Sequence, residues 1–490
     1  MVDAFRLSFE PIAKTWDSSP VLIVIGSKQQ LTASRLIERL PESVRSLWPR
    51  MLADVKPGDC SKTVSTWIDD AKVNRVIAGV LPDSCSRHNS PAQPHAIRGL
   101  VSDNAKAKGD VTLIMATADS SLAMAQTAAI ARGLPSFQRK QTASDSVPSH
   151  IHVSFLTDDG STPDLHKLDT LAYAVRSASE WVDTPTSELH TLELIDHAKK
   201  IAKETGAEIT VIQGKDLHDK GFGGLWGVGK AANKPPALVV LQHKAKNSTS
   251  HVTWVGKGIV YDTGGLSIKD STHMPGMKAD MGGAAAVLAA FRAAVKMGCN
   301  VNLSAVLCLA ENAIGPDAQR PDDIITLYSG KTVEVNNTDA EGRLVLGDGL
   351  AYAVKHLKPD VLIDIATLTG AQLVSTGKRH AAIISNDEAI EQAAVHAGRR
   401  SGDLVHPLIY CPEFFRDEFK SDIADMKNSV KDRMNAQTSC AGQFLADHLG
   451  DKFTGQWLHI DIAGPAGIGE RASGFGVALL LDLLEHNHKS

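Results

Sequence analysis

Short apolar blocks alternate with polar segments along the first third of the chain. Runs rich in branched side chains predict buried strands at 21–26, 76–81, 111–115 and 150–156. A helical pattern covers 121–131 and is stopped by Gly133 and Pro135. The polar run 158–163 follows the last of these strands and is the best domain boundary in the chain. Residues 1–165 are therefore predicted to form an N-terminal α/β domain.

The same alternation continues over residues 166–490, which are predicted to form a second, larger domain. Apolar runs predict strands at 209–211, 237–242, 252–255, 303–309, 361–365, 381–385 and 457–462. Helical patterns lie at 281–297, 343–357, 388–399, 440–448 and 475–485. Strands that alternate with helices favour a mostly parallel or mixed sheet covered on both faces. The predicted fold class is α/β, with two such domains.

Composition adds the class of protein. The 490 residues are 43% hydrophobic and 22% charged, which is typical of a globular protein with more than one core. The net charge of −5 gives no general reason to expect nucleic acid or an anionic membrane as a partner. No apolar run approaches the roughly 20 residues of a membrane span, and the first residues lack a signal-peptide pattern. We expect a cytoplasmic protein.

The six cysteines are scattered, without a C-x-x-C pair: Cys60, Cys85, Cys299, Cys308, Cys411 and Cys440. This spacing fits neither a disulfide framework nor a thiolate zinc site. Thiols of this kind suit a reducing compartment. We expect all six to be buried and inert.

The decapeptide 335–344, Val-Asn-Asn-Thr-Asp-Ala-Glu-Gly-Arg-Leu, places two carboxylates and a guanidinium within five residues. A short predicted strand at 331–335 precedes it and an apolar helical pattern follows. The charged residues thus lie on a strand-to-helix turn, where open α/β folds usually place their chemistry. The ordinary alternative is a helix start, with Asp339 as N-cap, Glu341 in the first turn and Arg343 in solvent.

A second polar stretch lies about seventy residues upstream. Lys257 is expected to end a strand, Asp262 precedes a Gly-Gly turn, and Asp280 stands where a helix begins. Singly, each fits a surface charge, a turn residue or an N-cap. The two aspartates, together with Asp339 and Glu341, give four carboxylates at the ends of elements in one domain, where we expect them to converge.

Four gathered carboxylates would repel one another strongly. Two divalent cations would balance their charge, and all-oxygen ligation suits magnesium or manganese, with zinc also admissible. A coordinating lysine would have to be neutral, which nearby dications promote. The sequence therefore predicts a two-metal site built from these residues.

At these residues the chain resembles the leucyl aminopeptidase family of cytosolic exopeptidases with two metal ions. The family signature Asn-Thr-Asp-Ala-Glu-Gly-Arg-Leu stands intact at 337–344, and Gly-Lys-Gly and Lys-Ala-Asp-Met-Gly-Gly occur at the expected offsets. The sequence has Tyr261-Asp262-Thr263-Gly264 where Phe-Asp-Ser-Gly is commoner, and Lys278 where Arg is commoner. Neither departure removes a ligand. The resemblance covers the second domain, which it implies is the catalytic one.

The resemblance implies a role for each polar residue of the site. Lys257, Asp262, Asp280 and Glu341 would hold one metal ion, and Asp262, Asp339 and Glu341 the other. Lys269 and Arg343 would be the catalytic pair, with Arg343 binding a bicarbonate that shuttles protons. Met277 resembles the residue that lines the pocket for the N-terminal side chain, although a Met there is most often simple packing.

The family also implies the reaction and the assembly. A water activated by two metals would release single N-terminal residues, leucine-like ones preferred, from short peptides. The ions would be zinc or manganese, with magnesium admissible. Family members form hexamers whose active sites face an internal cavity, so a homohexamer is expected here.

Two other functions would each leave their own signal in the sequence. A non-catalytic binding or scaffold role would be favoured by a lost ligand, and none is lost. A DNA-binding paralogue would be favoured by a basic run, which the sequence lacks, and a salt-dependent gel shift would test it.

Residues 224–230 fit the phosphate-loop pattern G-x-x-x-x-G-K. Ala231 then replaces the hydroxyl residue that would hold magnesium, and a Pro-Pro pair follows.

Overall fold

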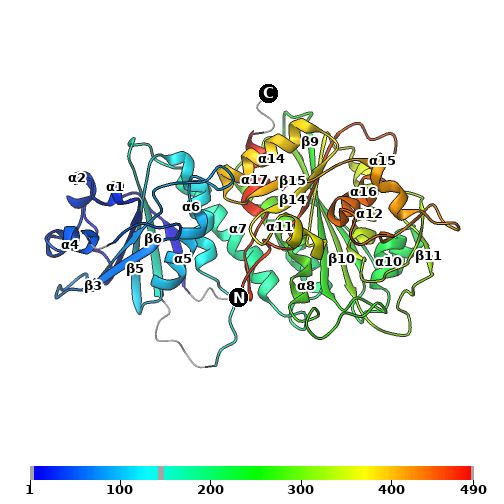
Figure 1. The fold of residues 1–490 in the computed structure, drawn as a ribbon, viewed down its shortest axis with the longest axis horizontal. Coiled ribbons are helices and arrows are strands. Elements are labelled where there is room, and N and C mark those ends of the chain that lie inside the picture. Colours follow the sequence, from blue (N-terminus) through cyan, green and yellow to red (C-terminus); the bar gives the residue numbers. More distant parts are fainter. Residues whose placement is uncertain (1–4, 54, 142–147, 487–490) are drawn as a thin grey trace. The chain divides into compact units, whose positions relative to one another are not determined.

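The computed structural model describes residues 5–53, 55–141 and 148–486. The chain divides into two compact units (Figure 1). One comprises residues 1–176 with 398–402, and the other comprises 177–397 with 403–490. Helix α7 (Leu165–Asp183) begins where the sequence placed the boundary, and that division at residue 165 stays a prediction.

The first unit is built on a six-stranded sheet. Its strand order is β1 (Arg6–Phe9), β6 (Pro148–Thr157), β5 (Gly109–Thr117), β2 (Val21–Gly26), β4 (Arg75–Val80) and β3 (Lys62–Trp67). Neighbouring strands run parallel except for β3 with β4. The apolar runs read from the sequence form β2, β4, β5 and β6. The short strands β1 and β3 were missed because few of their side chains are buried.

Helices complete this unit. They are α1 (Lys28–Leu31), α2 (Ser34–Ile37), α3 (Glu42–Arg45), α4 (Trp48–Ala53), α5 (Pro94–Asn104) and α6 (Ala123–Gly133). Trp16 and Trp48 pack with side chains of β2 and β4 in a buried core. The indole of Trp48 donates to the carbonyl of Leu31 at 2.8 Å, which satisfies its polar group inside that core.

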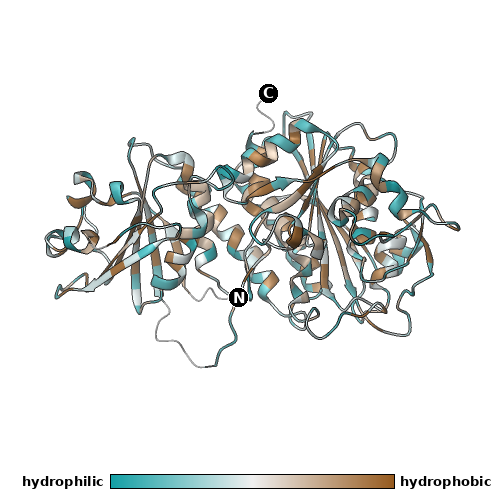
Figure 2. Cartoon of the chain, in the orientation of Figure 1, coloured by the Kyte–Doolittle hydropathy of each residue, from teal (hydrophilic) through white to brown (hydrophobic). Residues whose placement is uncertain are grey.

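The second unit is built on an eight-stranded mixed sheet. Its order is β15 (Val405–Pro407), β14 (Ala381–Ser385), β17 (Gln456–Asp461), β13 (Val361–Ala366), β9 (His251–Asp262), β10 (Asn302–Asn312), β8 (Ala237–His243) and β7 (Glu208–Gln213). The four central strands, β17 to β10, are mutually parallel. Hydrophobic residues line the strands of this sheet along most of their length (Figure 2). The α/β prediction, with parallel or mixed sheets, is confirmed.

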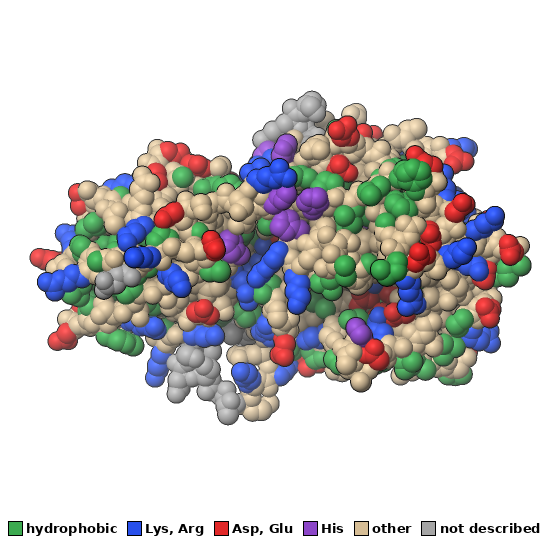
Figure 3. Space-filling model, in the orientation of Figure 1, with side chains coloured by type: hydrophobic (Ala, Val, Ile, Leu, Met, Phe, Trp, Pro, Cys, Tyr) green, Lys and Arg blue, Asp and Glu red, His purple; other side chains and the backbone are tan. Residues whose placement is uncertain are grey.

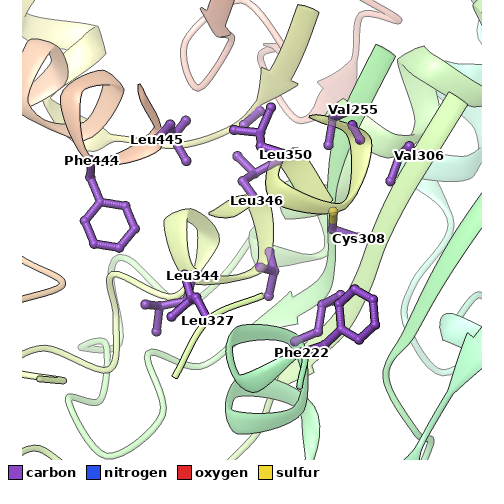
Figure 4. Packing of buried hydrophobic residues seen from close by; sticks show 14 of the residues in the cluster. Phe222, Val255, Val306, Cys308, Leu327, Leu344, Leu346, Leu350, Phe444 and Leu445 are labelled. Carbon is purple, nitrogen blue, oxygen red and sulfur yellow. The ribbon is translucent and has the colours of Figure 1, made fainter. Parts of the chain in front are cut away.

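Helices cover both faces of the large sheet, as an apolar sheet requires (Figure 1). On one face lie α8 (Thr191–Thr205), α11 (Gly282–Lys296) and α17 (Val477–His486), and on the other lie α10 (Gly223–Gly229), α12 (Gly342–Tyr352) and α16 (Gln437–Ala446). Helix α12 packs into the core between α10, α16 and the sheet (Figure 4). Leu344, Leu346 and Leu350 are fully buried there. This packing fixes the decapeptide that leads into α12.

Two local expectations were wrong, the one for the end of a strand at Lys257 and the one for the cysteines. Lys257 does not end a strand, because pairing with β10 carries β9 on to Asp262. The strand predicted before the decapeptide is confirmed as β12 (Thr332–Glu334), which joins β11 (Ile324–Thr326) and β16 (Met426–Lys427) in a small sheet separate from the main one. Only Cys308 and Cys440 are buried, whereas Cys60 and Cys85 are exposed.

Candidate active site

Strand β9 supplies two of the polar side chains, and a β-bulge lets them face one site. Lys257 and Asp262 are five residues apart, so a regular strand would point them to opposite faces of the sheet. Pairing with β10 runs regularly to Ile259 opposite Ala310, and the next pair is Asp262 opposite Asn312. Strand β9 therefore holds one extra residue at this point, which shifts its phase. Both side chains are almost fully buried.

Asp280 comes from a 3-10 helix, Met277–Met281, which leads directly into α11. The first turn of α11 lies close to the sheet because it contains no side chain at Gly283. A Cβ at that position would lie 2.1 Å from the carbonyl oxygen of Ile365. The close approach places Asp280 over β9, where its carboxylate meets Lys257.

Asp339 and Glu341 come from the decapeptide before α12. Neither side chain caps this helix: Glu341 is the N-cap residue, and it makes no capping hydrogen bond. Gly342 follows, and a Cβ there would lie 2.6 Å from Cε of Lys257. Only a glycine therefore lets the decapeptide lie against the Lys257 side chain. The helix-start alternative does not describe these carboxylates.

These side chains meet in one cluster. Nζ of Lys257 lies 2.8 Å from Oδ1 of Asp280 and 3.0 Å from Oε1 of Glu341. Nζ of Lys269 lies 2.9 Å from Oδ2 of Asp262 and 2.5 Å from Oδ1 of Asp339. Carboxylate oxygens of Asp262, Asp280 and Glu341 all lie within 4.8 Å of one another. The structure thus brings together the four carboxylates and two lysines that the sequence singled out.

Lys269 reaches this cluster from a loop that follows β9. Gly264 turns the chain with a φ of 83°, a conformation that side chains other than glycine rarely adopt. A Cβ there would also lie 2.9 Å from Oδ1 of Asp339. The backbone N–H of Lys269 donates to the carbonyl of Thr263 at 2.9 Å, which closes the loop. The side chain of Lys269 is 15% exposed, compared with 3% for Lys257.

Burial and crowding of like charges dominate the electrostatics. Burial raises the pKa of the Glu341 carboxyl, and the neighbouring charge of Asp262 raises it further. Burial raises the pKa of Asp280 and of Asp339 in the same way. Burial alone would lower the pKa of Lys257, but the charges of Asp280 and Glu341 outweigh it and raise that pKa. Such a cluster is costly for folding and is therefore typical of a functional site.

Arg343, two residues beyond Glu341, is buried beside the cluster. Its Nη1 donates to the carbonyl of Asn428 at 3.1 Å, and its guanidinium lies 6.0 Å from the ring centroid of Phe444. Burial lowers the pKa of Arg343 to about 10, so it stays charged at neutral pH. Its Nε is buried without a hydrogen-bond partner among the described residues. A small anion could accept from this group.

Sequence reasoning missed three residues that orient the cluster. Nδ2 of Asn312 donates to Oδ1 of Asp262 at 2.8 Å. Oγ1 of Thr367 donates to Oδ1 of Asp280 at 2.8 Å, and the carbonyl of Thr367 accepts from Lys257 at 2.9 Å. Asn428 binds the decapeptide, accepting from the N–H of Asn336 and donating to the carbonyl of Asn337. They lie 50 to 110 residues from their partners, so no local signal could have found them.

Met277, the weakest of the sequence candidates, opens the 3-10 helix that carries Asp280 and is half-buried. It stands three residues before Asp280 in that helix. The phosphate-loop pattern at 224–230 forms helix α10 instead of a loop before a helix. Its backbone N–H groups are therefore not arranged to bind phosphate.

The donor set fits a pair of hard or borderline divalent cations. Carboxylates provide most of the candidate ligands, and a neutral lysine would complete the set. Oδ2 of Asp280 is buried without a hydrogen-bond partner among the described residues, and a buried oxygen of this kind needs a cation or a donor. The residues present therefore fit a two-metal centre.

Comparison with known proteins identifies related chains over both units. The family model of the cytosol aminopeptidase family, catalytic domain, matches residues 176–481, and that of the M17 aminopeptidase N-terminal domain 2 matches residues 19–143. A probable aminopeptidase of Mus musculus, NPEPL1, is 49% identical over 488 residues, which covers 97% of this chain and 92% of the relative.

Solved structures of leucyl aminopeptidases have the same fold. That of Trypanosoma cruzi, in its apo form, has a TM-score of 0.90 at 42% identity, covering 98% of this chain and 96% of the other. That of Trypanosoma brucei in complex with bestatin has a TM-score of 0.91 at 37% identity, covering 98% of this chain and 95% of the other.

In the part of this chain that the structure describes, no helix has the length and apolar character needed to cross a membrane.

Proposed function

Since the chain belongs to the cytosol aminopeptidase family, M17, and is a metal-dependent aminopeptidase, we propose that it releases single leucine-like residues from the N-termini of short peptides. The observation that carries this proposal is the convergence of four carboxylates and two lysines in one buried cluster. The name of the matched family, cytosol aminopeptidase, further supports action in the cytoplasm.

The ligand sets are those that membership in the family implies. Lys257, Asp262, Asp280 and Glu341 would hold one divalent ion, and Asp262, Asp339 and Glu341 the other. Zinc and manganese both suit this set, and magnesium is admissible by hardness. Two ions held there would lower the pKa of a water molecule and so supply the nucleophile for hydrolysis near neutral pH.

The chain's own residues orient the substrate and stabilise charge. Lys269 is the more exposed lysine, and its ammonium can donate a hydrogen bond to the scissile carbonyl oxygen as negative charge develops there. Arg343 has a buried Nε without a partner among the described residues, which supports a bicarbonate bound at its guanidinium as proton shuttle. Met277 would line the pocket for the N-terminal side chain.

Assay of the purified protein against a panel of aminoacyl amides tests this function. We expect hydrolysis of leucine-like amides, loss of activity on treatment with a chelator, and recovery with zinc or manganese. N-acetylated amides should not be cleaved, because an aminopeptidase requires a free α-amine. Cleavage of blocked substrates at the same rate would contradict the proposal.

The assignment of the site has its own test in Asp339→Ala. We expect this variant to lose hydrolysis and bound metal, because the remaining carboxylates lose a shared cation and repel one another. Asp317→Ala, on an exposed loop of the same unit, is the control. Full metal occupancy with normal activity in Asp339→Ala would remove Asp339 from the site.

A further inference from the structure

A second group of metal-binding side chains lies in the first unit: Glu10, His150 and His152. Each offers one ligand atom, and these atoms all lie within 4.8 Å of one another. We propose that they form a site for one zinc-like divalent ion, separate in position and in chemistry from the carboxylate cluster of the second unit.

Strand pairing brings these residues to one face of the sheet. Strands β1 and β6 run parallel, with Arg6 opposite His150 and Ser8 opposite His152. Side chains two residues apart point to the same face of a strand. Ser8, His150 and His152 therefore share that face, and Glu10 follows directly after β1. The imidazole rings of the two histidines have centroids 3.7 Å apart.

Hydrogen bonds hold the polar atoms of these side chains close together. Oγ of Ser8 donates to Oε1 of Glu10 at 2.8 Å and lies 2.7 Å from Nε2 of His150. Nδ1 of His152 lies 2.7 Å from the same Oε1 of Glu10. The Ser8 hydroxyl is thus a fourth polar atom beside the three ligand atoms, at the position that a water or the hydroxyl itself would take in a four-coordinate site.

The distances suit a small ion. Ligands about 2.0–2.1 Å from a tetrahedral zinc ion lie roughly 3.3 Å apart. Atoms at most 4.8 Å apart need only side-chain rotations to reach that arrangement. All three side chains are half-buried, so the cost of removing their water is moderate and an ion can enter from solvent.

The donor types set this site apart from the carboxylate cluster. Two imidazoles and one carboxylate favour zinc and its borderline neighbours, whereas the ligands assigned in the second unit contain no imidazole. Asp169 of α7, which accepts from the N–H of Phe9 at 3.0 Å, adds a second negative charge near Glu10. A bound ion would tie the edge strand β1 to β6 in addition to their backbone pairing.

The difference in donor type gives a direct test on the intact protein. The full chain is stripped with a chelator and dialysed against a buffer of fixed free zinc concentration, the same for every variant. Zinc is then counted by mass spectrometry, and its ligands are identified by X-ray absorption, in which imidazole gives a distinctive outer-shell scattering. We expect one more zinc per chain in the unmodified protein than in the double variant His150→Gln/His152→Gln, and imidazole scattering only in the former.

Two further variants make the result unambiguous. Glu10→Gln keeps the size and hydrogen bonding of the side chain while removing its charge, so it should weaken zinc binding without disturbing the strand. His95→Gln, on α5 of the same unit, should leave the imidazole signal unchanged. Equal zinc counts in the unmodified protein and the double variant, or zinc without imidazole ligands, would show a hydrogen-bonded polar cluster only.

The test does not depend on the proposed peptidase function. Asp339→Ala should lose metal from the carboxylate cluster and keep the imidazole-bound zinc. The double histidine variant should show the opposite pattern. A protein inactive against every peptide substrate could still bind this zinc, and an active one could lack it.

Discussion

At the scale of single residues, the two lysines of the cluster have different surroundings. Lys257 is enclosed by Asp280, Glu341 and the carbonyl of Thr367, whereas the more exposed Lys269 spans Asp262 and Asp339. The surroundings of Lys257 suit a metal ligand, and those of Lys269 suit a hydrogen-bond donor to the substrate. A substitution that keeps side-chain length and removes the amine can therefore separate their roles.

Lys269→Met should lower kcat by about 10²–10³, the usual cost of one oxyanion donor, with metal content near normal. Lys257→Met should instead lose metal from one position, and excess metal should restore part of the activity. Steady-state kinetics and metal analysis of both variants measure this. Metal loss in Lys269→Met with full metal in Lys257→Met would mean that the two roles are reversed.

Gly342→Ala should displace Lys257 without unfolding the protein. The new Cβ would lie 2.6 Å from Cε and 2.7 Å from Nζ of Lys257, so either that side chain or the decapeptide must move. Overpacking of this kind costs about 1–3 kcal/mol. We expect activity to fall more than tenfold and one metal to bind more weakly, with a modest decrease in Tm.

Gly370→Ala is the matched control for this substitution. A Cβ at Gly370 would meet no atom within 4 Å, and the residue does not require a positive φ. Its kinetics and metal content should equal those of the unmodified protein. Normal kinetics in Gly342→Ala as well would show that the cluster tolerates movement of Lys257.

The identity of the charged residues could be read from the sequence, but their supporting contacts could not. The carboxylates stand in short, unusual segments whose charge pattern draws attention. Asn312, Thr367 and Asn428 are ordinary residues in ordinary segments, and they join the site only because β10, β13 and the segment after β16 fold beside it. Long-range packing of this kind leaves no local pattern.

At the scale of elements, the turn that follows α16 contains a histidine that should make stability depend on pH. His448 is buried against the ring of Phe444, and its Nδ1 lies 2.8 Å from Oγ of Ser329. Burial lowers the pKa of His448 to about 3, with Lys331 lowering it further. The folded protein therefore holds this imidazole neutral well below the pH at which an unfolded chain would protonate it.

The sign of the effect follows from proton binding. Between about pH 6.5, where an unfolded histidine titrates, and about pH 3, the unfolded chain binds a proton that the folded chain does not. The contribution of the neutral His448 imidazole to the free energy of unfolding is complete above pH 6.5. It is lost as pH falls, by about 1.4 kcal/mol per pH unit. His448→Gln should flatten the dependence of Tm on pH in this range.

His218→Gln, an exposed position on a short helix of the same unit, is the control for this effect. It should leave the pH dependence of Tm as it is in the unmodified protein. The same slope in all three proteins would show that His448 is protonated in the folded state.

Elements were predicted best where one pattern dominated. The central strands of both sheets consist of continuous apolar runs, and these were found. Strand β9 was cut short at Val255, because Gly256, Lys257 and Gly258 do not resemble a strand in sequence. The glycines are there because α11 packs on them: a Cβ at Gly256 would lie 2.6 Å from Cα of Ala284. Tertiary packing, which local strand propensity does not reflect, determines the conformation of this segment.

At the scale of the whole molecule, we expect a homohexamer. Several large hydrophobic side chains of the second unit are strongly exposed in a single chain, among them Val374 at 90%, Met434 at 91% and Phe414 at 72%. Contact with other copies would cover such groups. Acidic and basic side chains both occur across the face shown in Figure 3.

Sedimentation should therefore give about six times the 52.3 kDa mass of one chain. Active sites facing an internal cavity would admit short peptides and bar folded proteins, so a peptide should be trimmed faster than a folded protein with the same N-terminal sequence. A stable monomer of full activity would contradict this prediction.

The bulge in β9 has a consequence for how this gene can change. Substitutions at positions 260 and 261 leave the number of residues between Lys257 and Asp262 intact. Loss of a single codon between positions 259 and 262 would remove the extra residue and turn one of the two side chains to the opposite face of the sheet. A descendant of this kind would retain every charged residue of the site and its complete signature, and it would still lack the means to assemble the cluster.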